Sequence, residues 1–410
     1  MAMRVEVLNT GTELLLGHVV NTHLKYLAEA LFPLGLRIGR QVTVPDGEPI
    51  RAALAETLGR ADVVFVTGGL GPTTDDVTRE AVAELLGLEL VQDAGVMAAI
   101  EARFARRGMQ MSARNARQAQ RPREAVVLAN ANGTAPGLYV PPLQGRTPHL
   151  FLLPGPPREL KPMFEEAVLP ILRGIVPQGA AMGMRNFRLS GLGESVVEER
   201  VGPALLALGI ELGYCARPGE VDVRVIGAAT ELERAEEIIR AELGAHLVSQ
   251  DCRELEQVAV DLLTARGETL ATVESCTGGA LADRVTNVPG ASAVFVEGFV
   301  TYANEAKTRA AGVDPALIAA HGAVSREVAQ AMAEGARRVT GADHALATTG
   351  IAGPGGGTAE KPVGTVFIAL ATKLGATVVE QHRFPTDRAT FKQLVTQTAL
   401  DLLRRTLVAG

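Results

Sequence analysis

The sequence TVESCTGGALADRVTNVPGASAVFVEGFVTYANEAK occupies residues 272–307 and decides the fold expected for the last part of this chain. An apolar run at 270–273 leads into a glycine-rich turn, and a helical pattern follows that turn. After a second turn at 289–292 comes another strand-like run, followed by Tyr302 and Lys307. This succession of strands, turns and helices is typical of an α/β domain.

Two glycine-rich loops in this part of the sequence can present backbone N–H groups to an anion. Residues 275–279 lie between an expected strand and an expected helix, where the first N–H groups of the helix have no partner within it. Residues 348–357 follow a short apolar run, and their glycines let the backbone approach a ligand closely. The residues that we expect to contact the substrate here are Ser275, Thr277, Gly278, Thr349 and Gly350.

Length, composition and charge set the outer frame. With 410 residues, 47% hydrophobic and 21% charged, the chain is expected to form two or three globular domains. Its net charge of -6 provides no field that would attract nucleic acid or an anionic membrane. We therefore expect small anionic molecules as ligands, and neither direct nucleic-acid binding nor membrane binding.

The cysteines and the N-terminus indicate the compartment. Cys215, Cys252 and Cys276 are widely spaced and form no CxxC pair, which argues against a disulfide framework or a zinc site and favours a reducing compartment. The chain opens directly into a strand-like segment, without a signal sequence or an apolar run of transmembrane length. We expect a cytoplasmic protein.

In the first part of the chain, short apolar runs alternate with helical patterns. Alternation of this kind predicts βαβ units and hence a parallel sheet. The expected strands are Val5–Leu8, Ile38–Val44 and Val63–Val66, and the expected helices are Asn21–Phe32, Pro49–Leu58 and Val77–Leu86.

Glycines and acidic residues gather at the expected strand ends, where parallel sheets bind their ligands. TGGLGPTTDDVT at 67–78 follows one strand, and Pro45-Asp46-Gly47 follows another. The glycines can cradle a phosphate, while carboxylates are hard ligands for a divalent cation; alternatively, Asp75 and Asp76 only cap the next helix. The expected phosphate contacts are Gly68, Gly69 and Thr73, and the expected metal ligands are Glu13, Asp46, Asp75 and Asp76.

These motifs give residues 1 to about 170 a resemblance to the molybdopterin-binding (MoCF-like) domain of the CinA family (competence/damage-inducible protein A). The resemblance also includes Gly11-Thr12-Glu13, Gly133-Thr134-Ala135-Pro136-Gly137 and Pro154-Gly155-Pro156-Pro157. It implies that Asp46 and Asp76 lie in an active site that cleaves ADP-ribose with a divalent metal. Many relatives have Gly-Asp-Glu where this chain has Gly11-Thr12-Glu13, so Glu13 is the only acid left there.

A small α+β pattern occupies the middle of the chain. It resembles the KH-like linker module of CinA proteins, but Gly191-Leu192-Gly193-Glu194 lacks the Gly-x-x-Gly spacing of RNA-binding relatives. We therefore expect a spacer or dimerising module. Its expected elements are strand Phe187–Leu189, helix Glu194–Leu208, strands Ile210–Tyr214 and Val221–Ile226, and helix Glu231–Leu243.

The stretch at 272–307 resembles the nicotinamide-nucleotide amidase domain of the same family, and the match continues through residues 322–325, 350–354 and 361–365. This resemblance implies hydrolysis of nicotinamide mononucleotide without a metal. It assigns the catalytic roles to Ser292 and Lys307, with Tyr302 close by. It also implies that Arg388, at the start of the last helix, binds the substrate phosphate, which suits its forked donors.

The residue types support a serine–lysine mechanism. Serine needs a base to attack an amide, and no histidine stands in a convincing triad pattern. A partly buried lysine can lose its proton and act as that base, whereas arginine cannot. Cys276 is the competing nucleophile, since a thiol is intrinsically stronger at neutral pH. Backbone N–H groups near Ser275 or Thr349 are expected to stabilise the oxyanion.

We therefore expect three domains: a parallel-sheet MoCF-like domain at 1–170, an α+β KH-like linker at 171–250 and an α/β amidase domain at 251–410. The expected function is pyridine-nucleotide salvage by a homodimer with amidase and ADP-ribose pyrophosphatase activities. Two alternatives stay open. The chain could act as a recruitment factor in competence or DNA damage, or its N-terminal domain could bind a pterin or nucleotide without hydrolysis.

Overall fold

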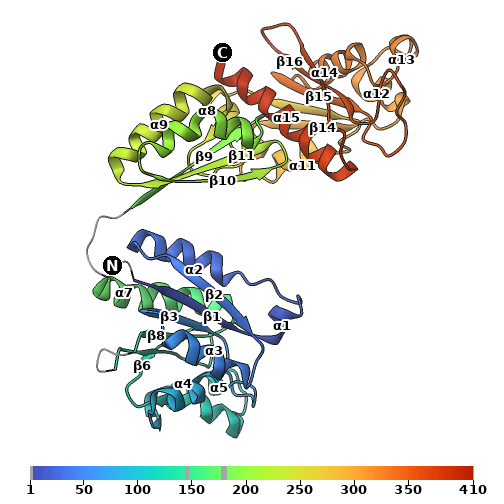
Figure 1. Ribbon diagram of the computed structural model, residues 1–410. Helices are drawn as coiled ribbons and strands as arrows, with labels where there is room; N and C mark the ends of the chain where they lie inside the picture. Colours follow the sequence, from blue (N-terminus) through green and yellow to red (C-terminus); the bar gives the residue numbers. More distant parts are fainter. Residues whose placement is uncertain (1–2, 144–146, 177–181, 410) are drawn as a thin grey trace. The chain divides into compact units, whose positions relative to one another are not determined.

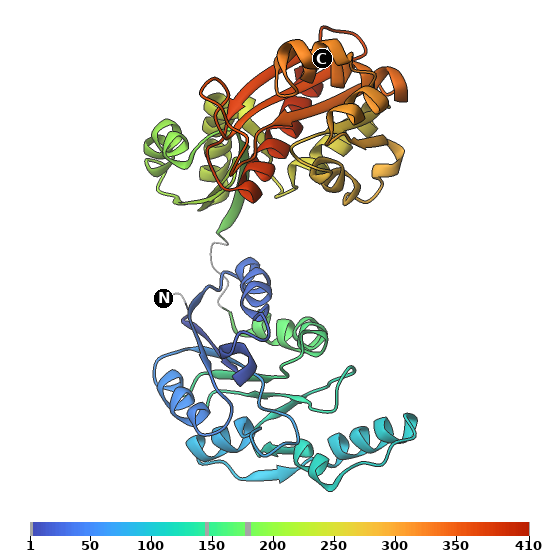
Figure 2. The same ribbon diagram turned by 90° about the vertical axis from the view of Figure 1, so that its right-hand side faces the viewer.

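The computed structural model describes residues 3–143, 147–176 and 182–409, and the chain divides into two compact units (Figure 1, Figure 2). The first unit is Met1–Met182 and the second is Gly183–Gly410. Across the described ranges, no helix is both long enough and apolar enough to cross a membrane.

A six-stranded sheet in the order β2-β1-β3-β8-β7-β6 forms the centre of the first unit. Its first four strands pair in parallel, and its last two are antiparallel. The parallel sheet expected from the alternating pattern is thus confirmed for β2, β1, β3 and β8, whereas the antiparallel strands β7 and β6 were not expected. The strands are β1 (Val5–Thr10), β2 (Ile38–Val44), β3 (Val63–Thr67), β6 (Val126–Leu128), β7 (Gly137–Val140) and β8 (His149–Leu153), and β4 (Leu90–Gln92) pairs separately with β5 (Gln120–Pro122).

Helices cover both faces of this sheet because alternate side chains of each strand point to opposite sides. In β3, Phe65 packs with Leu27 and Phe164 on one face, whereas Val64 and Val66 pack on the other. Two buried cores result, one on each side of the sheet. The helices are α1 (Thr12–Leu15), α2 (His23–Leu31), α3 (Pro49–Leu58), α4 (Thr78–Leu86), α5 (Ala94–Arg106), α6 (Pro157–Met163) and α7 (Leu169–Ile175), with 3-10 helices η1 (Phe32–Leu34) and η2 (Ala113–Ala119) and the π-helical turn η3 (Phe164–Val168).

The second unit begins with an antiparallel sheet in the order β10-β11-β9-β12. Its apolar side chains, Phe187 and Val223 among them, pack against two helices, which confirms the expected α+β module. The short strand β12 was not predicted. The elements are β9 (Gly183–Ser190), α8 (Glu194–Leu206), β10 (Glu211–Arg217), β11 (Glu220–Gly227), α9 (Ala229–Leu243), η4 (Gly244–His246) and β12 (Leu247–Ser249).

A second sheet of this unit, in the order β14-β13-β15-β16-β17, holds the quoted stretch of sequence. β14, β13 and β15 run parallel, and β16 and β17 are antiparallel. The elements are α10 (Leu255–Arg266), β13 (Leu270–Glu274), α11 (Ala280–Thr286), η5 (Ala291–Ala293), β14 (Phe295–Val300), α12 (Asn304–Ala311), α13 (Pro315–His321), α14 (Arg326–Thr340), β15 (His344–Gly350), β16 (Thr365–Thr372), β17 (Val378–Arg383) and α15 (Arg388–Ala409).

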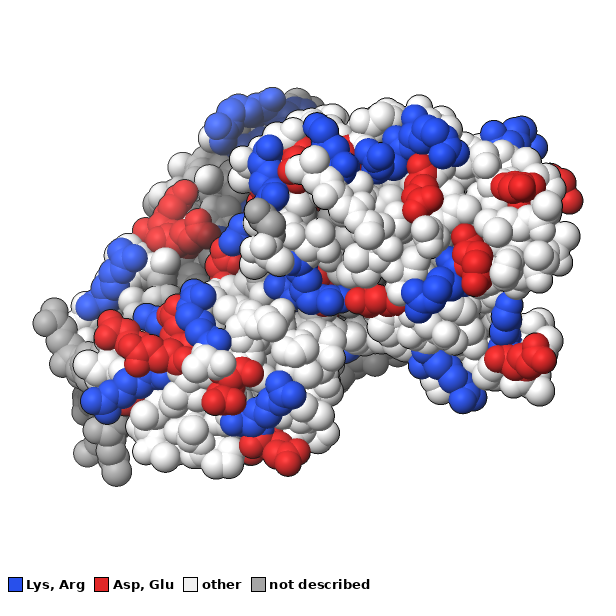
Figure 3. Space-filling view, turned by 90° about the horizontal axis from the view of Figure 1, so that it is seen from above, with Lys and Arg blue, Asp and Glu red and all other residues white. Residues whose placement is uncertain are grey.

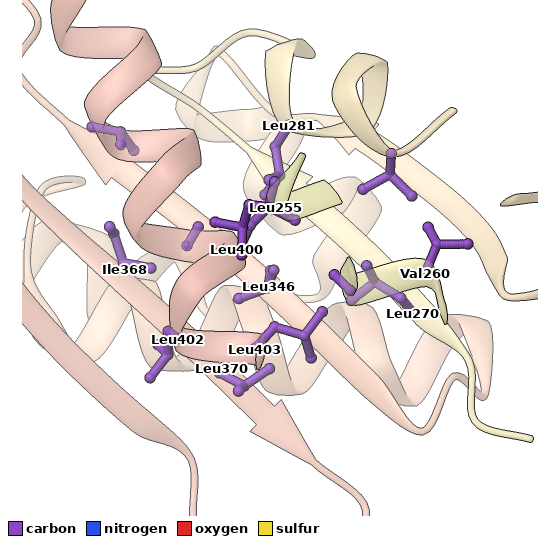
Figure 4. Packing of buried hydrophobic residues seen from close by; sticks show 14 of the residues in the cluster. Leu255, Val260, Leu270, Leu281, Leu346, Ile368, Leu370, Leu400, Leu402 and Leu403 are labelled. Carbon is purple, nitrogen blue, oxygen red and sulfur yellow. The ribbon is translucent and has the colours of Figure 1, made fainter. Parts of the chain in front are cut away.

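Both faces of this second sheet are also covered. Figure 4 shows one core, in which Leu270, Leu346 and Ile368 of the sheet meet Leu255 of α10 and Leu400 of α15. On the other face, α14 packs on the small side chains of β13, β15 and β16. Burial on both sides explains the continuous apolar runs of β13 and β15.

Charged side chains of both signs are interspersed on the surface visible in Figure 3. Charged side chains of the second unit form ion pairs, such as Arg240 with Glu236 and Arg253 with Asp261. Exposed pairs of this kind contribute little to stability. The visible face is therefore a mixed surface.

Candidate active sites

The carboxyl ends of three parallel strands meet at one edge of the second sheet. Ser275 follows β13, Lys307 lies beyond the end of β14, and Thr349 lies at the end of β15. A pocket of about 290 Å³ opens there. Its lining includes Ser275, Cys276, Tyr302, Asn304, Lys307, Thr349, Gly350, Gly353 and Arg388.

Lys307 and Ser275 form the central contact of this pocket. The Lys307 side chain is buried, and its Nζ donates to Ser275 Oγ at 3.1 Å and to the carbonyl oxygen of Thr301 at 2.8 Å. Burial lowers the pKa of the lysine, because a buried ammonium loses its hydration. Within the described residues, no carboxylate forms an ion pair with it. A buried amine without a counter-ion is suited to accept a proton from a neighbouring hydroxyl.

Glu274 fixes the turn that carries Ser275. Its buried carboxylate accepts hydrogen bonds from the backbone N–H groups of Gly279, Leu281 and Ala282, at 3.0, 3.0 and 2.9 Å. These are N–H groups at the start of α11, which otherwise lack partners. The Ser275 N–H also donates to the carbonyl of Thr348 at 2.9 Å. The serine is therefore held by β15 on one side and by a capped turn on the other.

Cys276 lines the pocket but is a poor nucleophile. The side chain is 5% exposed, and burial raises the pKa of its thiol to about 12. The thiolate is the reactive form of cysteine, so almost none is present at neutral pH. The geometry favours Ser275 over Cys276.

The expected contact between Ser292 and Lys307 is wrong, because the structure does not bring these two residues together. Ser292 is exposed on η5, before β14 begins, whereas Lys307 follows the end of that strand. The neighbouring Val294 carbonyl accepts from the N–H of Leu270, at the start of β13. A six-residue strand spans about 20 Å at roughly 3.3 Å per residue. Ser292 thus lies at the edge opposite the pocket, and Ser275 takes the position expected for it.

Arg388 presents a guanidinium at the mouth of the same pocket. It opens α15, and its Nη2 donates to the hydroxyl of Tyr302 at 2.8 Å while Nη1 donates to the carbonyl of Gly353 at 3.1 Å. The neighbouring Asp387 accepts from the backbone N–H groups of Ala389 and Thr390 instead. No ion pair of Arg388 occurs among the residues described, so its charge is available to an anion.

Of the other residues expected to contact the substrate, some line the pocket and some do not. Thr349 and Gly350 line the pocket, although the Thr349 hydroxyl donates to the carbonyl of Ala323 at 2.7 Å. Thr277 is buried, and its hydroxyl pairs with that of Thr348 at 2.7 Å, so it stabilises the turn from inside. Gly278 lies in the same turn but does not line the pocket.

Asn304 and Glu274 are among the residues of this site that were not predicted. Asn304 stands three positions before Lys307, which places both on one side of the first turn of α12. The spacing of three residues between Asn304 and Lys307 could have revealed that Asn304 belongs to the site. Glu274 was visible beside Ser275, but nothing in the sequence shows that its carboxylate turns back to cap α11.

In the first unit, the carboxyl ends of β1, β2 and β3 also meet at one edge. Gly68 and Gly69 follow β3 with φ angles of 98° and 67°, a region that favours glycine. A Cβ at Gly68 would lie 2.5 Å from Thr10 Oγ1, and one at Gly69 would lie 2.0 Å from Thr78 Oγ1. Close backbone packing therefore requires both glycines.

The expected metal ligands lie near this edge but do not form one cluster. Asp46 accepts from the N–H and hydroxyl of Thr12 at 2.9 and 3.1 Å, and Asp76 accepts from the N–H and hydroxyl of Thr73. Glu13 lies in the first turn of α1, and Asp75 is exposed. In the described part of the chain, no three His, Cys, Asp or Glu side chains are grouped to hold a metal ion. The residues therefore do not fit a preformed cage of protein ligands.

Three family models match successive parts of the chain. The "Probable molybdopterin binding domain" matches residues 6–174, the "Damage-inducible protein CinA KH domain" matches 184–245, and the "CinA C-terminal domain" matches 252–407.

Individual relatives match almost the full length. A "CinA-like protein" of Akkermansia muciniphila is 48% identical over 97% of this chain and 96% of its own, and one of Citrifermentans bemidjiense is 44% identical over 99% and 98%. Among solved structures, the competence/damage inducible protein CihA from Agrobacterium tumefaciens is 42% identical, covers 38% of this chain and 96% of its own, and has a TM-score of 0.37.

Proposed function

The chain belongs to the CinA family, and from that premise we propose that its C-terminal domain hydrolyses the carboxamide of nicotinamide mononucleotide to nicotinic acid mononucleotide and ammonia. The contact between the buried Lys307 amine and the Ser275 hydroxyl is the observation that carries the proposal. Such a pair supplies a nucleophile and its base without a metal or a histidine.

In the first half of the reaction, neutral Lys307 takes the proton of Ser275 as Oγ attacks the carboxamide carbon. The resulting oxyanion is stabilised by backbone N–H groups of the two glycine-rich loops. Lys307 then passes its proton to the nitrogen, the C–N bond breaks, and ammonia leaves. Ser275 is now esterified to the nicotinate carbonyl.

Water completes the reaction through the same two residues. Lys307 takes a proton from the water as its oxygen attacks the ester carbon. It then returns that proton to Ser275 Oγ as the ester bond breaks. The acid is released, and both side chains return to their starting states.

The recognition of a mononucleotide rests on Arg388 and Tyr302. Their mutual hydrogen bond places a guanidinium and a phenol side by side at the pocket, and Arg388 has no carboxylate partner in the described ranges. A phosphate accepts two parallel hydrogen bonds from a guanidinium. The phosphate would thus be bound at Arg388 and the carboxamide at Ser275.

Ammonia release from nicotinamide mononucleotide by the purified chain tests this function. Nicotinamide riboside, which lacks the phosphate, is the matched control, and we expect it to react much more slowly. If the mononucleotide releases no ammonia, the amidase proposal fails, and a recruitment role in competence or DNA damage becomes the better hypothesis.

We propose a second activity, cleavage of the pyrophosphate of ADP-ribose, for the first unit. It is favoured by the position of the Gly68-Gly69 loop at the same sheet edge as Asp46 and Asp76. Magnesium often binds through one or two carboxylates together with substrate phosphates. A divalent metal recruited with the substrate in this way would neutralise phosphate charge, and it does not need a preformed cage. Phosphate-ester products from ADP-ribose would distinguish hydrolysis from pterin or nucleotide binding alone.

We also propose that the protein is a homodimer, and that the amidase needs no cofactor. Sedimentation at several protein concentrations would test the first statement. Activity of a preparation freed of metal would test the second.

A further inference from the structure

The glycine-rich loop of the first unit rests on a buried arginine. Arg79, the second residue of α4, is 1% exposed. Its Nη1 donates to the carbonyl of Leu70 at 2.6 Å and its Nη2 to the carbonyl of Gly71 at 3.2 Å, while its buried Nε has no hydrogen-bond partner in the part of the chain that the structure describes. No ion pair of Arg79 is present among the described residues.

A second arginine holds the other half of the loop. Arg117, on η2, donates from Nη1 to the carbonyl of Thr73 at 2.7 Å and from Nη2 to the carbonyl of Asp76 at 3.3 Å. Its Nη2 also pairs with Glu80 at 2.8 Å. Four carbonyl groups between residues 70 and 76 are thus bound by two guanidinium groups.

This arrangement fixes the direction of the N–H groups as well. In a trans peptide unit, the C=O and the following N–H point in opposite directions. The peptides whose carbonyls face the arginines therefore direct the N–H groups of Gly71, Thr74 and Val77 away from them; Pro72 has no N–H. Among the described residues, none of these three N–H groups has an acceptor.

We propose that Arg79 and Arg117 are positioning residues that hold the loop at 70–76 as a receptor for a phosphate or pyrophosphate group. They bind its carbonyl oxygens from behind, so that its free N–H groups face the anion. The inference rests on the second proposed activity and extends it by naming the residues that shape its anion site.

The charge of Arg79 supports this role. An unpaired charge in a protein interior is costly, and burial accordingly lowers the pKa of this guanidinium. Asp76 and Glu80 lie close enough to favour the charge, and Arg117 disfavours it. An anion bound on the loop would attract the positive charges of Arg79 and Arg117, because both guanidinium groups lie directly behind the loop. It would thus offset part of the cost of burying the Arg79 charge without an ion pair.

The test measures binding to the full chain by calorimetry, of inorganic pyrophosphate with magnesium present and of ADP-ribose in the presence of EDTA, which stops the proposed hydrolysis. Arg117→Ala should weaken both affinities at least tenfold. Arg117→Lys should weaken them nearly as much, because one ammonium keeps the charge but cannot hold two carbonyls in the planar fork of a guanidinium. The matched control is Arg114→Ala, an exposed arginine on the same 3-10 helix, and its affinity should equal that of the unaltered chain.

Arg79→Met keeps an unbranched apolar stem in the buried position but removes the guanidinium, and it extends the test to Arg79, with the melting temperature of the variant as the check on folding. If the folded Arg79→Met binds normally, or if Arg117→Lys binds as tightly as the unaltered chain, the positioning role is overturned. A chain that binds neither probe also overturns it. Pyrophosphate binding without ADP-ribose hydrolysis would refute the second activity and leave the anion site standing.

Discussion

Lys307 Nζ lies 3.1 Å from Ser275 Oγ, although 32 residues separate them in the chain. Parallel pairing of β13 with β14 produces this contact, because both strands end at the same edge of the sheet. The serine is then placed by the capped turn before α11, and the lysine by the first turn of α12. Each has a rigid support, which covalent catalysis requires.

Ser275→Ala should lower ammonia release from nicotinamide mononucleotide by a factor on the order of 10³ or more, since it removes the hydroxyl that Lys307 contacts. Single-turnover measurement isolates this step from product release. Ser292→Ala is the matched control, because that serine lies at the opposite edge, and it should keep nearly full activity. A reversal of the two results would show that the working pocket differs from the one described.

The secondary structure could be predicted from the sequence, but the position of the nucleophile could not. The strands and helices followed from apolar runs and periodicity: the helix expected at Glu194–Leu208 is Glu194–Leu206 in the structure. Lys307 and Arg388 followed from residue chemistry together with the family motifs. The serine was misassigned because the family resemblance was taken to give the nucleophile role to the turn at 289–292 and only substrate contacts to Ser275. A residue before a parallel strand and one after it lie at opposite edges, so strand order, not sequence distance, decides which side chains meet.

Other features depend on contacts that no local pattern encodes. The carboxylates Asp46 and Asp76 each accept hydrogen bonds from a threonine, which the sequence does not indicate. The carbonyl contacts of Arg79 are also invisible, because a helical arginine normally suggests an exposed surface. Tertiary packing determines both arrangements.

The pH dependence of the amidase should reflect Lys307. Burial lowers its pKa below the ordinary lysine value, and the neutral amine is the active form. Turnover should therefore rise with pH through the lowered pKa and level off above it. Lys307→Arg should abolish this activity, because a guanidinium does not accept the proton. The control, Lys373→Arg, alters an exposed lysine paired with Asp343 and should keep the original profile. A flat profile for the unaltered chain from pH 6 upwards would argue against lysine as the base.

Alkylation should distinguish the three cysteines. Cys215 and Cys252 are exposed, whereas the Cys276 thiol is buried and has a pKa of about 12. Iodoacetamide at neutral pH should modify the first two and leave Cys276 intact, as peptide mass spectrometry would show. Amidase activity should survive this treatment and also the Cys276→Ala substitution. Rapid modification of Cys276 with parallel loss of activity would return the nucleophile role to the thiol.

Chelation should separate the two proposed activities. EDTA should stop ADP-ribose hydrolysis, because the proposed site of the first unit combines a phosphate loop with the nearby carboxylates Asp46 and Asp76, and magnesium should restore it. Deamidation should continue, since Ser275 and Lys307 need no metal. Both activities are measured on one preparation, so equal loss of both would contradict this division.

The final prediction concerns the contact between the KH-like module and the amidase domain. Gln397 of α15 is 4% exposed, and it donates to Glu220 of β11 at 2.8 Å while accepting from Arg284 of α11 at 2.8 Å. Residues 251–410 contain the complete pocket and both cores of the amidase sheet except Val248 of β12. That fragment should therefore fold and deamidate the mononucleotide at nearly the original kcat.

Its stability should nevertheless be lower than that of a fragment spanning 183–410. The shorter fragment lacks Glu220, so Gln397 and the apolar surface around it become exposed. For a domain of this size, each kcal/mol lost from the free energy of unfolding lowers Tm by about 2–4 °C. Calorimetry of the two fragments measures the difference, and Gln397→Ala in the longer fragment should reproduce part of it without changing kcat. A shorter fragment that is folded but inactive would show instead that the KH-like module shapes the active site through α11 and α15.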